Sequence, residues 1–241
     1  MQTKLAAFIS DKPAGREAQE ILGRCVHCGF CTATCPTYQL LGNELDGPRG
    51  RIYLIKSMLE GTACSKSTLL HLDRCLTCRS CETTCPSGVE YGRLLEIGRQ
   101  VAEKTVPRSI GRRLGRRLLA WFLTSMLFPV LLGLGRSVRR LCPERVARYI
   151  PMRYAAGEIP TTSRSRQMIV LEGCAQPALS PNINAAAARV LDRLGISLIS
   201  APDVGCCGAL SLHLSIEDRA RQTMRRNIDA WWPLLESGAE C

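Results

Sequence analysis

Residues 25–36 read CVHCGFCTATCP, and residues 75–86 read CLTCRSCETTCP. Both stretches follow the pattern C-x-x-C-x-x-C-x-x-x-C-P, so the same box of four cysteines and a proline occurs twice. Cysteines repeated at steps of three, with a fourth carried on the following segment, are typical of loops that bind [4Fe-4S] clusters. The sequence therefore predicts two clusters, and these boxes decide the expected fold.

The ligands of the two clusters are expected to cross between the boxes. After the third cysteine, the chain carries the fourth cysteine away from its own loop and toward the other cluster. The first cluster is assigned Cys25, Cys28, Cys31 and Cys85, and the second is assigned Cys75, Cys78, Cys81 and Cys35. Electron transfer needs no acid or base from this chain, so no catalytic residue is assigned.

Two other uses of the boxes stay open. Zinc sites also use C-x-x-C pairs, but a long loop usually separates the pairs, and the third cysteine and the proline have no role there. Disulfides fit less well, because cysteines three residues apart on tight turns have poor bridging geometry. In the first box, Gly29 either brings the backbone close to the cluster or forms a plain turn, and His27 is expected to face solvent or lie behind the ligands.

The composition is that of a globular protein with many cysteines. Of 241 residues, 46% are hydrophobic and 22% charged, which excludes a disordered or collagen-like chain. Fourteen cysteines would suggest disulfides in a small secreted protein, but residues 1–20 show no signal peptide. We therefore expect a reducing compartment, the cytoplasm, with cysteines used as ligands or reactive thiols.

The net charge is strongly positive. The formal value of +11 falls to about +7 when two negatively charged clusters are counted. The excess includes the arginine runs Arg112, Arg113, Arg116, Arg117, Arg136, Arg139 and Arg140. Nucleic acid, anionic lipid or an acidic partner subunit would suit such runs. We expect no nucleic-acid partner, because the chain shows no helix-turn-helix pattern and no interleaving of aromatic and basic residues.

The segment between the boxes, residues 36–74, is expected to be helical. After the turn Asp46-Gly47-Pro48, a helical stripe of apolar residues runs from Ile52 to Leu59 and stops at Gly61, and a second short helix is expected over 68–72. The clusters would then lie between helices. Residues 1–100 are accordingly expected to form an all-helical ferredoxin-type module.

A basic and apolar connector is expected over residues 101–167. Within it, residues 118–135, LLAWFLTSMLFPVLLGLG, carry no formal charge and reach the lower length limit for a membrane span. Pro129 interrupts the stretch, and arginines flank both of its ends, which disfavours a span. We expect a buried or partner-facing helix, with an interfacial membrane-binding segment as the second interpretation.

Residues 168–241 are expected to begin an α/β domain after the polar linker 155–167. A strand over 168–171, a helix over 183–194 and a strand over 196–200 form a β-α-β pattern. Cysteines follow both strands, where the edge of an α/β sheet usually binds ligands. Cys174, Cys206 and Cys207 are thus a candidate thiol site, whereas Cys64 and Cys142 are assigned to packing. The pattern looks incomplete, so we expect the domain to be truncated at Cys241.

Several segments together resemble the iron-sulfur subunits of bacterial glycolate oxidase, also called glycolate dehydrogenase. They are CVHCGFCTATCPTYQLLG, ELDGPRGRIYLIK, HLDRCLTCRSCETTCPSGV, LEGCAQPALSPN and RRNIDAWWP. The resemblance covers both ends of the chain and is weakest from Val101 to Gln167. It implies a two-cluster ferredoxin module followed by cysteine-rich CCG domains, usually two, of which this chain holds the first part.

The resemblance also implies an electron-transfer role within a complex. A separate flavin (FAD) subunit would oxidise glycolate to glyoxylate, and electrons would pass through the two clusters toward a membrane quinone, with a peripheral membrane contact at the inner face. The alternatives are the related subunits of anaerobic glycerol-3-phosphate dehydrogenase and lactate utilisation, or a thiol/disulfide enzyme like heterodisulfide reductase. Charges near the boxes, at Arg24, Arg74 and Arg79, either tune the cluster potentials or are solvated surface residues.

Overall fold

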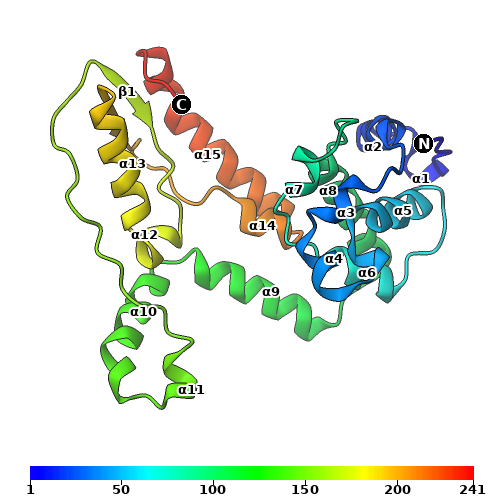
Figure 1. The fold of residues 1–241 in the computed structure, drawn as a ribbon, viewed down its shortest axis with the longest axis horizontal. Helices are drawn as coiled ribbons and strands as arrows, with labels where there is room; N and C mark the ends of the chain where they lie inside the picture. Colours follow the sequence, from blue (N-terminus) through cyan, green and yellow to red (C-terminus); the bar gives the residue numbers. More distant parts are fainter. The chain divides into compact units, whose positions relative to one another are not determined.

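The computed structural model describes residues 1–241 and divides into two compact units, Met1–Ser109 and Ile110–Cys241. The N-terminal unit is all helical, and the C-terminal unit adds a two-stranded sheet to its helices (Figure 1). The expected order, a helical module followed by an α/β region, is confirmed. The division falls inside the segment 101–167 that the sequence sets apart as a connector, and the three-part boundaries stay a prediction.

The N-terminal unit repeats one arrangement around its two cysteine boxes. Its elements are α1 Ala7–Ser10, α2 Pro13–Arg24, α3 Phe30–Ala33, α4 Pro36–Leu41, η1 Glu44–Asp46, α5 Pro48–Leu59, α6 Lys66–Asp73, α7 Ser80–Thr83 and α8 Tyr91–Thr105. Each box starts just after a helix ends, contains a one-turn helix (α3 or α7) and leads into another helix. The two helices expected between the boxes are confirmed as α5 and α6.

Local sequence signals explain where α5 and α6 begin. Pro48 occupies the first turn of α5, where its missing N–H is not needed. A Cβ at Gly50 would lie 2.1 Å from the carbonyl oxygen of Glu44, so glycine is needed for α5 to pack against η1. A capping box formed by Ser65 and Thr68 starts α6. The close packing of α5 on η1 brings Asp46 to the middle of the unit.

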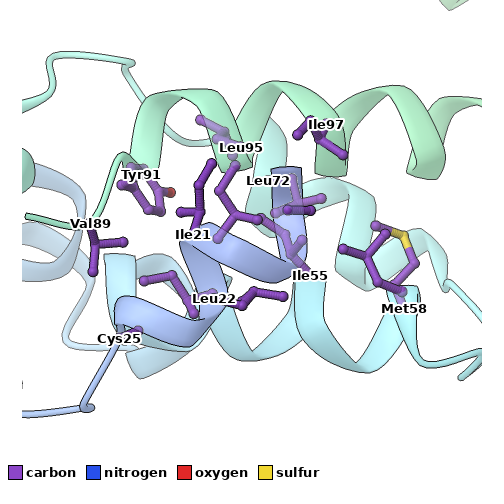
Figure 2. Close-up of a cluster of buried hydrophobic side chains, with 14 of the residues drawn as sticks. Ile21, Leu22, Cys25, Ile55, Met58, Leu72, Val89, Tyr91, Leu95 and Ile97 are labelled. Carbon is purple, nitrogen blue, oxygen red and sulfur yellow. The ribbon is translucent and has the colours of Figure 1, made fainter. Parts of the chain in front are cut away.

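The core of the N-terminal unit lies between α2, α5, α6 and α8. Figure 2 shows its buried side chains converging from these helices, with Cys25 at one end. Helices α5 and α8 approach each other closely, since a Cβ at Gly98 would lie 2.6 Å from the Cγ1 of Ile55. Because the second cysteine box lies between α6 and α8, this core holds the loop of that box between rigid helices.

The C-terminal unit is built on a short parallel sheet. Its elements are α9 Ile110–Leu123, α10 Leu127–Val138, η2 Arg139–Leu141, α11 Glu144–Ala147, β1 Arg166–Ile169, α12 Gln176–Leu179, α13 Asn182–Arg193, β2 Ile196–Ile199, α14 Ala209–His213 and α15 Glu217–Glu236. The strands pair in parallel from Arg166 opposite Ile196 to Ile169 opposite Ile199. The expected β-α-β unit is therefore confirmed, with α13 as its main helix.

The uncharged stretch 118–135 differs from the single helix expected for it. It is divided between α9 and α10 (Figure 1), because Pro129 lacks the N–H that would continue one helix across residues 124–126. Most of its large apolar side chains are exposed, among them Leu118 at 54% and Leu134 at 59%, whereas Ala120 and Phe128 are buried. No single helix has the length and apolarity to cross a membrane, and only α9 with α10 and η2, bent by 81°, meets that test as a pair.

Replacing Ile55 by alanine should destabilise the N-terminal unit by about 2–5 kcal/mol, because the side chain is fully buried against Gly98 and a cavity would remain. Urea unfolding followed by the helical circular dichroism signal measures the loss. Leu40→Ala is the control, since Leu40 is 83% exposed. Equal effects of the two substitutions would contradict this account of the core.

Candidate metal centre

The two cysteine loops share one backbone conformation. The third residue of each box is left-handed, with φ of 56° at His27 and 57° at Thr77, and the fifth is left-handed at Gly29 (86°) and Arg79 (60°). Three of these residues are not glycine, and such conformations persist where the surrounding structure holds them. In the second loop this turn lets the N–H of Thr77 donate to the Sγ of Cys75 at 3.4 Å.

Five cysteines from both boxes line a first cavity of about 440 Å³, measured with its open mouth. They are Cys25, Cys28, Cys31, Cys81 and Cys85. Gly29 also lines this cavity, and a Cβ there would lie 2.8 Å from the Nη1 of Arg49. Glycine at this position therefore serves both the left-handed turn and the close approach of an arginine.

A second cavity of about 390 Å³, also measured with its mouth, is lined by four cysteines. They are Cys35, Cys75, Cys78 and Cys81. The two cavities are neighbours, because Pro48, Cys81 and Tyr91 line both of them. Apart from the shared Cys81, the first cavity takes three cysteines of the first box and the trailing Cys85 of the second, and the second cavity takes the remaining cysteines of the second box and the trailing Cys35 of the first.

The donor set and its spacing suit a multi-atom group and not a single ion. No three His, Cys, Asp or Glu side chains converge closely enough anywhere in the chain to hold one metal ion. A zinc ion would need four ligands within about 2.3 Å of one point. All fourteen cysteines are unbridged thiols. The sulfurs surround hollows of similar size, which is the arrangement that two equal iron–sulfur groups require.

Sulfurs of the second box accept hydrogen bonds from nearby hydroxyl groups. The hydroxyl of Tyr91 donates to the Sγ of Cys75 at 3.7 Å, and the hydroxyl of Ser80 donates to the Sγ of Cys78 at 3.6 Å. Bonds from Ser80 lower the pKa of the Cys78 thiol. Donors to sulfur stabilise negative charge on a cluster and its ligands, so these residues are placed to raise a reduction potential.

A buried ionic network lies behind the second cavity. The ionised carboxylate of Asp46, which is 0% exposed, accepts from the Nδ1 of His71 at 2.9 Å and from the Nη1 of Arg74 at 2.8 Å. Burial by itself raises the pKa of this carboxyl, but the bonds from His71 and Arg74 outweigh it and hold the pKa below its ordinary value. Asp46 therefore carries its charge inside the unit at neutral pH.

Arg51 is the cavity residue that reasoning from the sequence missed. It lines the second cavity, it is 0% exposed, and its Nη2 is buried without a hydrogen-bond partner. His27 provides a similar atom at the first cavity, where its Nε2 is buried and unpartnered. Buried donors without protein acceptors fit cavities that hold sulfur-rich groups. Arg51 lies in the segment DGPRGR, which reads from the sequence only as a turn and a helix start, so no local pattern marks its burial.

The three arginines singled out from the sequence lie in different surroundings. Arg24 pairs with Glu20 and Glu90 in exposed ion pairs, and Arg79 pairs with Glu82 while its own side chain is 65% exposed. Arg74 instead reaches the buried carboxylate of Asp46. Only Arg74 is tied to the interior, so Arg24 and Arg79 are the weaker candidates for tuning a cluster.

The three C-terminal thiols meet after the two strands. Hydrogen bonding joins the thiol of Cys206 to those of Cys174 and Cys207, and burial raises the pKa of Cys206. Cys174 and Cys206 line a cavity of about 1260 Å³ including its mouth, with Arg219 and Arg226 from α15. The Nδ2 of Asn227 holds this loop by donating to the carbonyl of Cys206 at 2.9 Å.

Comparisons with known proteins match the two segments of the chain that carry these cysteines. Residues 21–89 match the 4Fe-4S dicluster domain family, and residues 168–241 match the cysteine-rich domain family. Over its full length the chain is 53% identical to the glycolate oxidase iron-sulfur subunit of Escherichia coli (strain K12). The chain is a relative of the glycolate oxidase iron-sulfur subunits. Its cofactors are two [4Fe-4S] clusters, as the dicluster domain and this relative indicate.

A second relative and the coverage complete the comparison. The chain is also 30% identical, over 86% of its length, to the probable glycolate oxidase iron-sulfur subunit of Bacillus subtilis (strain 168). It spans 60% of the length of the first relative and 53% of the second. No solved structure matches the chain. The expected resemblance to this group of subunits is confirmed.

Burial affects the ligand thiols before iron is bound. It raises the pKa of Cys31 to about 11 and that of Cys81 to about 12, and neighbouring thiols add to the effect. These thiols hold their protons at neutral pH in the iron-free chain, and iron must displace those protons to bind. Bound iron would supply the positive charge that keeps these sulfurs ionised.

The iron-free chain should lose stability as the pH rises from about 9 toward 11, because folding raises the pKa of Cys31 and Cys81 above the ordinary value of 9.0. A raised thiol pKa stabilises the fold below pH 9, and this contribution disappears as the pH passes through the folded pKa. Urea midpoints at a series of pH values measure the slope. The Cys31→Ala, Cys81→Ala double variant should show a shallower slope, and an equal slope would contradict the assignment.

Proposed function

We propose that this chain is the electron-transferring iron-sulfur subunit of a glycolate oxidase (glycolate dehydrogenase) complex. A flavin (FAD) subunit of the complex oxidises glycolate to glyoxylate, and this chain carries the electrons onward to a membrane quinone. The observation that supports the proposal best is the pair of neighbouring cavities, each lined by cysteines of both boxes and sharing Pro48, Cys81 and Tyr91. Two clusters bound in cavities that share lining residues would be close enough for single electrons to pass between them.

The ligand assignment is part of the same proposal. Cys25, Cys28, Cys31 and Cys85 hold one cluster, and Cys75, Cys78, Cys81 and Cys35 hold the other. Each bound cluster accepts and releases one electron. The residues of the chain hold the sulfurs in place, donate hydrogen bonds to them and keep water from the inner wall. Binding of the hydroxy acid belongs to the flavin subunit, so the substrate rests on similarity to the two relatives.

Replacing Cys25 or Cys85 by serine should damage the same cluster, although these cysteines belong to different boxes. Replacing Cys75 or Cys35 should damage the other one. The oxygen-free chain should hold about eight iron and eight sulfide, and low-temperature EPR after reduction separates the two signals. Cys64→Ser is the control, since Cys64 lies outside both cavities. Loss of different signals from Cys25→Ser and Cys85→Ser would refute the crossed assignment.

Glycolate should reduce the clusters only when the flavin subunit is present. The loaded chain is mixed without oxygen with that subunit and glycolate, and bleaching of the visible iron–sulfur absorption is recorded. The chain alone with glycolate should show no bleaching, because nothing in it is proposed to oxidise the hydroxy acid. If lactate or glycerol 3-phosphate reduced the clusters and glycolate did not, the chain would instead be assigned to one of the related complexes.

We propose a thiol site at Cys174, Cys206 and Cys207 in addition to the two clusters. The hydrogen bonds of the Cys206 thiol to Cys174 and Cys207, and the arginines that line the same cavity as Cys174 and Cys206, support a site that reacts through sulfur. The same observation favours a second candidate function, that of a thiol/disulfide enzyme like heterodisulfide reductase. Turnover of a disulfide by the chain without a flavin partner would favour this second function over electron conduction.

We further propose a cytoplasmic location with peripheral contact at the inner face of the membrane, through α9 and α10. Apolar side chains of both helices are about half exposed, among them Leu119, Trp121 and Leu131. Helix α9 also carries several arginines. Anionic lipid headgroups attract such basic segments, and neighbouring apolar side chains can enter the membrane interface. This location suits delivery of electrons to a quinone.

A further inference from the structure

Two arginines on α5 meet the two cavities in different ways. Arg49 stands at the first cavity, where its side chain is 38% exposed and its Nε donates to Glu44 at 2.7 Å. Arg51, two residues further on, stands at the second cavity with 1% of its side chain exposed. Solvent and Glu44 screen the charge of Arg49, whereas the charge of Arg51 acts through the protein interior, where electrostatic interactions are stronger.

Two hydrogen bonds hold Arg51 in place, and its Nη2 makes none. Its Nε donates to the carbonyl of His71 at 2.8 Å, and its Nη1 donates to the hydroxyl of Thr37 at 3.1 Å. The Nη2 lies 3.7 Å from the Oδ1 of Asp46, beyond a hydrogen bond, and has no other partner. A buried guanidinium N–H without an acceptor is costly, so its position on a cavity wall points to an acceptor inside the cavity.

The second cavity has more buried positive charge around it than the first. Arg99, which is 9% exposed, donates to the carbonyl of Cys75 at 2.9 Å and to the hydroxyl of Thr77 at 3.2 Å. At the first cavity the comparable contact is the partly exposed amino group of Met1, which donates to the carbonyl of Cys25 at 3.1 Å. The charged residues Asp46, Arg51 and Arg99 are all buried, and all three lie on the side of the second box.

The negative charge of Asp46 does not cancel this excess. Arg74 and His71 bond its two oxygens directly, while Arg51 stays at 3.7 Å. Two arginines therefore share one carboxylate, which leaves a positive balance behind the second cavity. Positive charge stabilises the reduced form of a cluster, because reduction adds a negative charge.

We propose that Arg51 makes the cluster held by Cys35, Cys75, Cys78 and Cys81 the more easily reduced of the two, through its buried charge and its unpartnered Nη2. The inference rests on the proposed function, since it assigns an order to the electron path. Electrons enter at the cavity of Cys25 and collect at the cavity of Cys75. Arg51 is thereby a residue that sets the direction of transfer.

An oxygen-free redox titration of the loaded chain, followed by EPR, tests the proposal. Cys28→Ser first identifies the signal of the first cluster. In Arg51→Gln, the ratio of reduced to oxidised second cluster at a fixed potential should fall by roughly tenfold or more. The ratio of reduced to oxidised first cluster at that potential should equal that of the wild type. Arg51→Lys, which keeps the charge, should show a smaller fall.

Arg49→Gln is the matched control, because it removes an arginine from the same helix at the other cavity. It should leave the second cluster unchanged. An unchanged ratio in Arg51→Gln, an equal change of both clusters, or an effect of Arg49→Gln as large as that of Arg51→Gln would overturn the proposal.

If the Arg51→Gln chain does not retain the second cluster, Asp46→Asn tests the proposal instead. This near-isosteric change removes the negative charge and keeps Arg51, so the reduced fraction of the second cluster should rise at the same fixed potential. A fall or no change would overturn the proposal. Iron and sulfide are counted before each titration: a wild-type chain without iron refutes the proposed function itself, whereas a loaded chain with unshifted ratios refutes only the role of Arg51.

Discussion

The buried carboxylate of Asp46 connects most of the segments that build the two cavities. It lies in η1 and accepts hydrogen bonds from His71 in α6 and from Arg74, which directly precedes the second box. Its backbone carbonyl accepts from Thr37 in α4 at 2.7 Å. An unpaired charge here would be strongly destabilising, so these segments must reach Asp46 together. The position of the second box therefore depends on a residue that binds no metal.

The same network extends to a sulfur. The hydroxyl of Thr37 lies 3.3 Å from the Sγ of Cys35 and also accepts the hydrogen bond of Arg51. A cysteine of the first box is thereby held by the residues that support the second. Gly50 makes this possible, because it alone lets α5 come close enough to η1 for Arg51 and Asp46 to share one interior.

The parts of the structure that follow from spacing could be predicted from the sequence. The two boxes, the helices α5 and α6 and the β-α-β unit all leave local patterns in the chain. The burial of Arg51 leaves none, because an arginine in a helix is usually solvated and only tertiary packing shows that Thr37, His71 and Asp46 enclose it. The break between α9 and α10 was signalled by Pro129, whereas the exposure of their apolar side chains depends on packing that no window of sequence contains.

Each cavity is lined by the trailing cysteine of the opposite box, Cys85 at the first cavity and Cys35 at the second. A half-module with one box would present three thiols around its hollow and a fourth, Cys35 or Cys85, directed to a hollow that the half does not contain. The two halves are therefore interlocked, and neither could have served as an independent one-cluster protein in this arrangement. Deleting either box would leave both cavities short of sulfur, so each cavity needs both boxes to be complete.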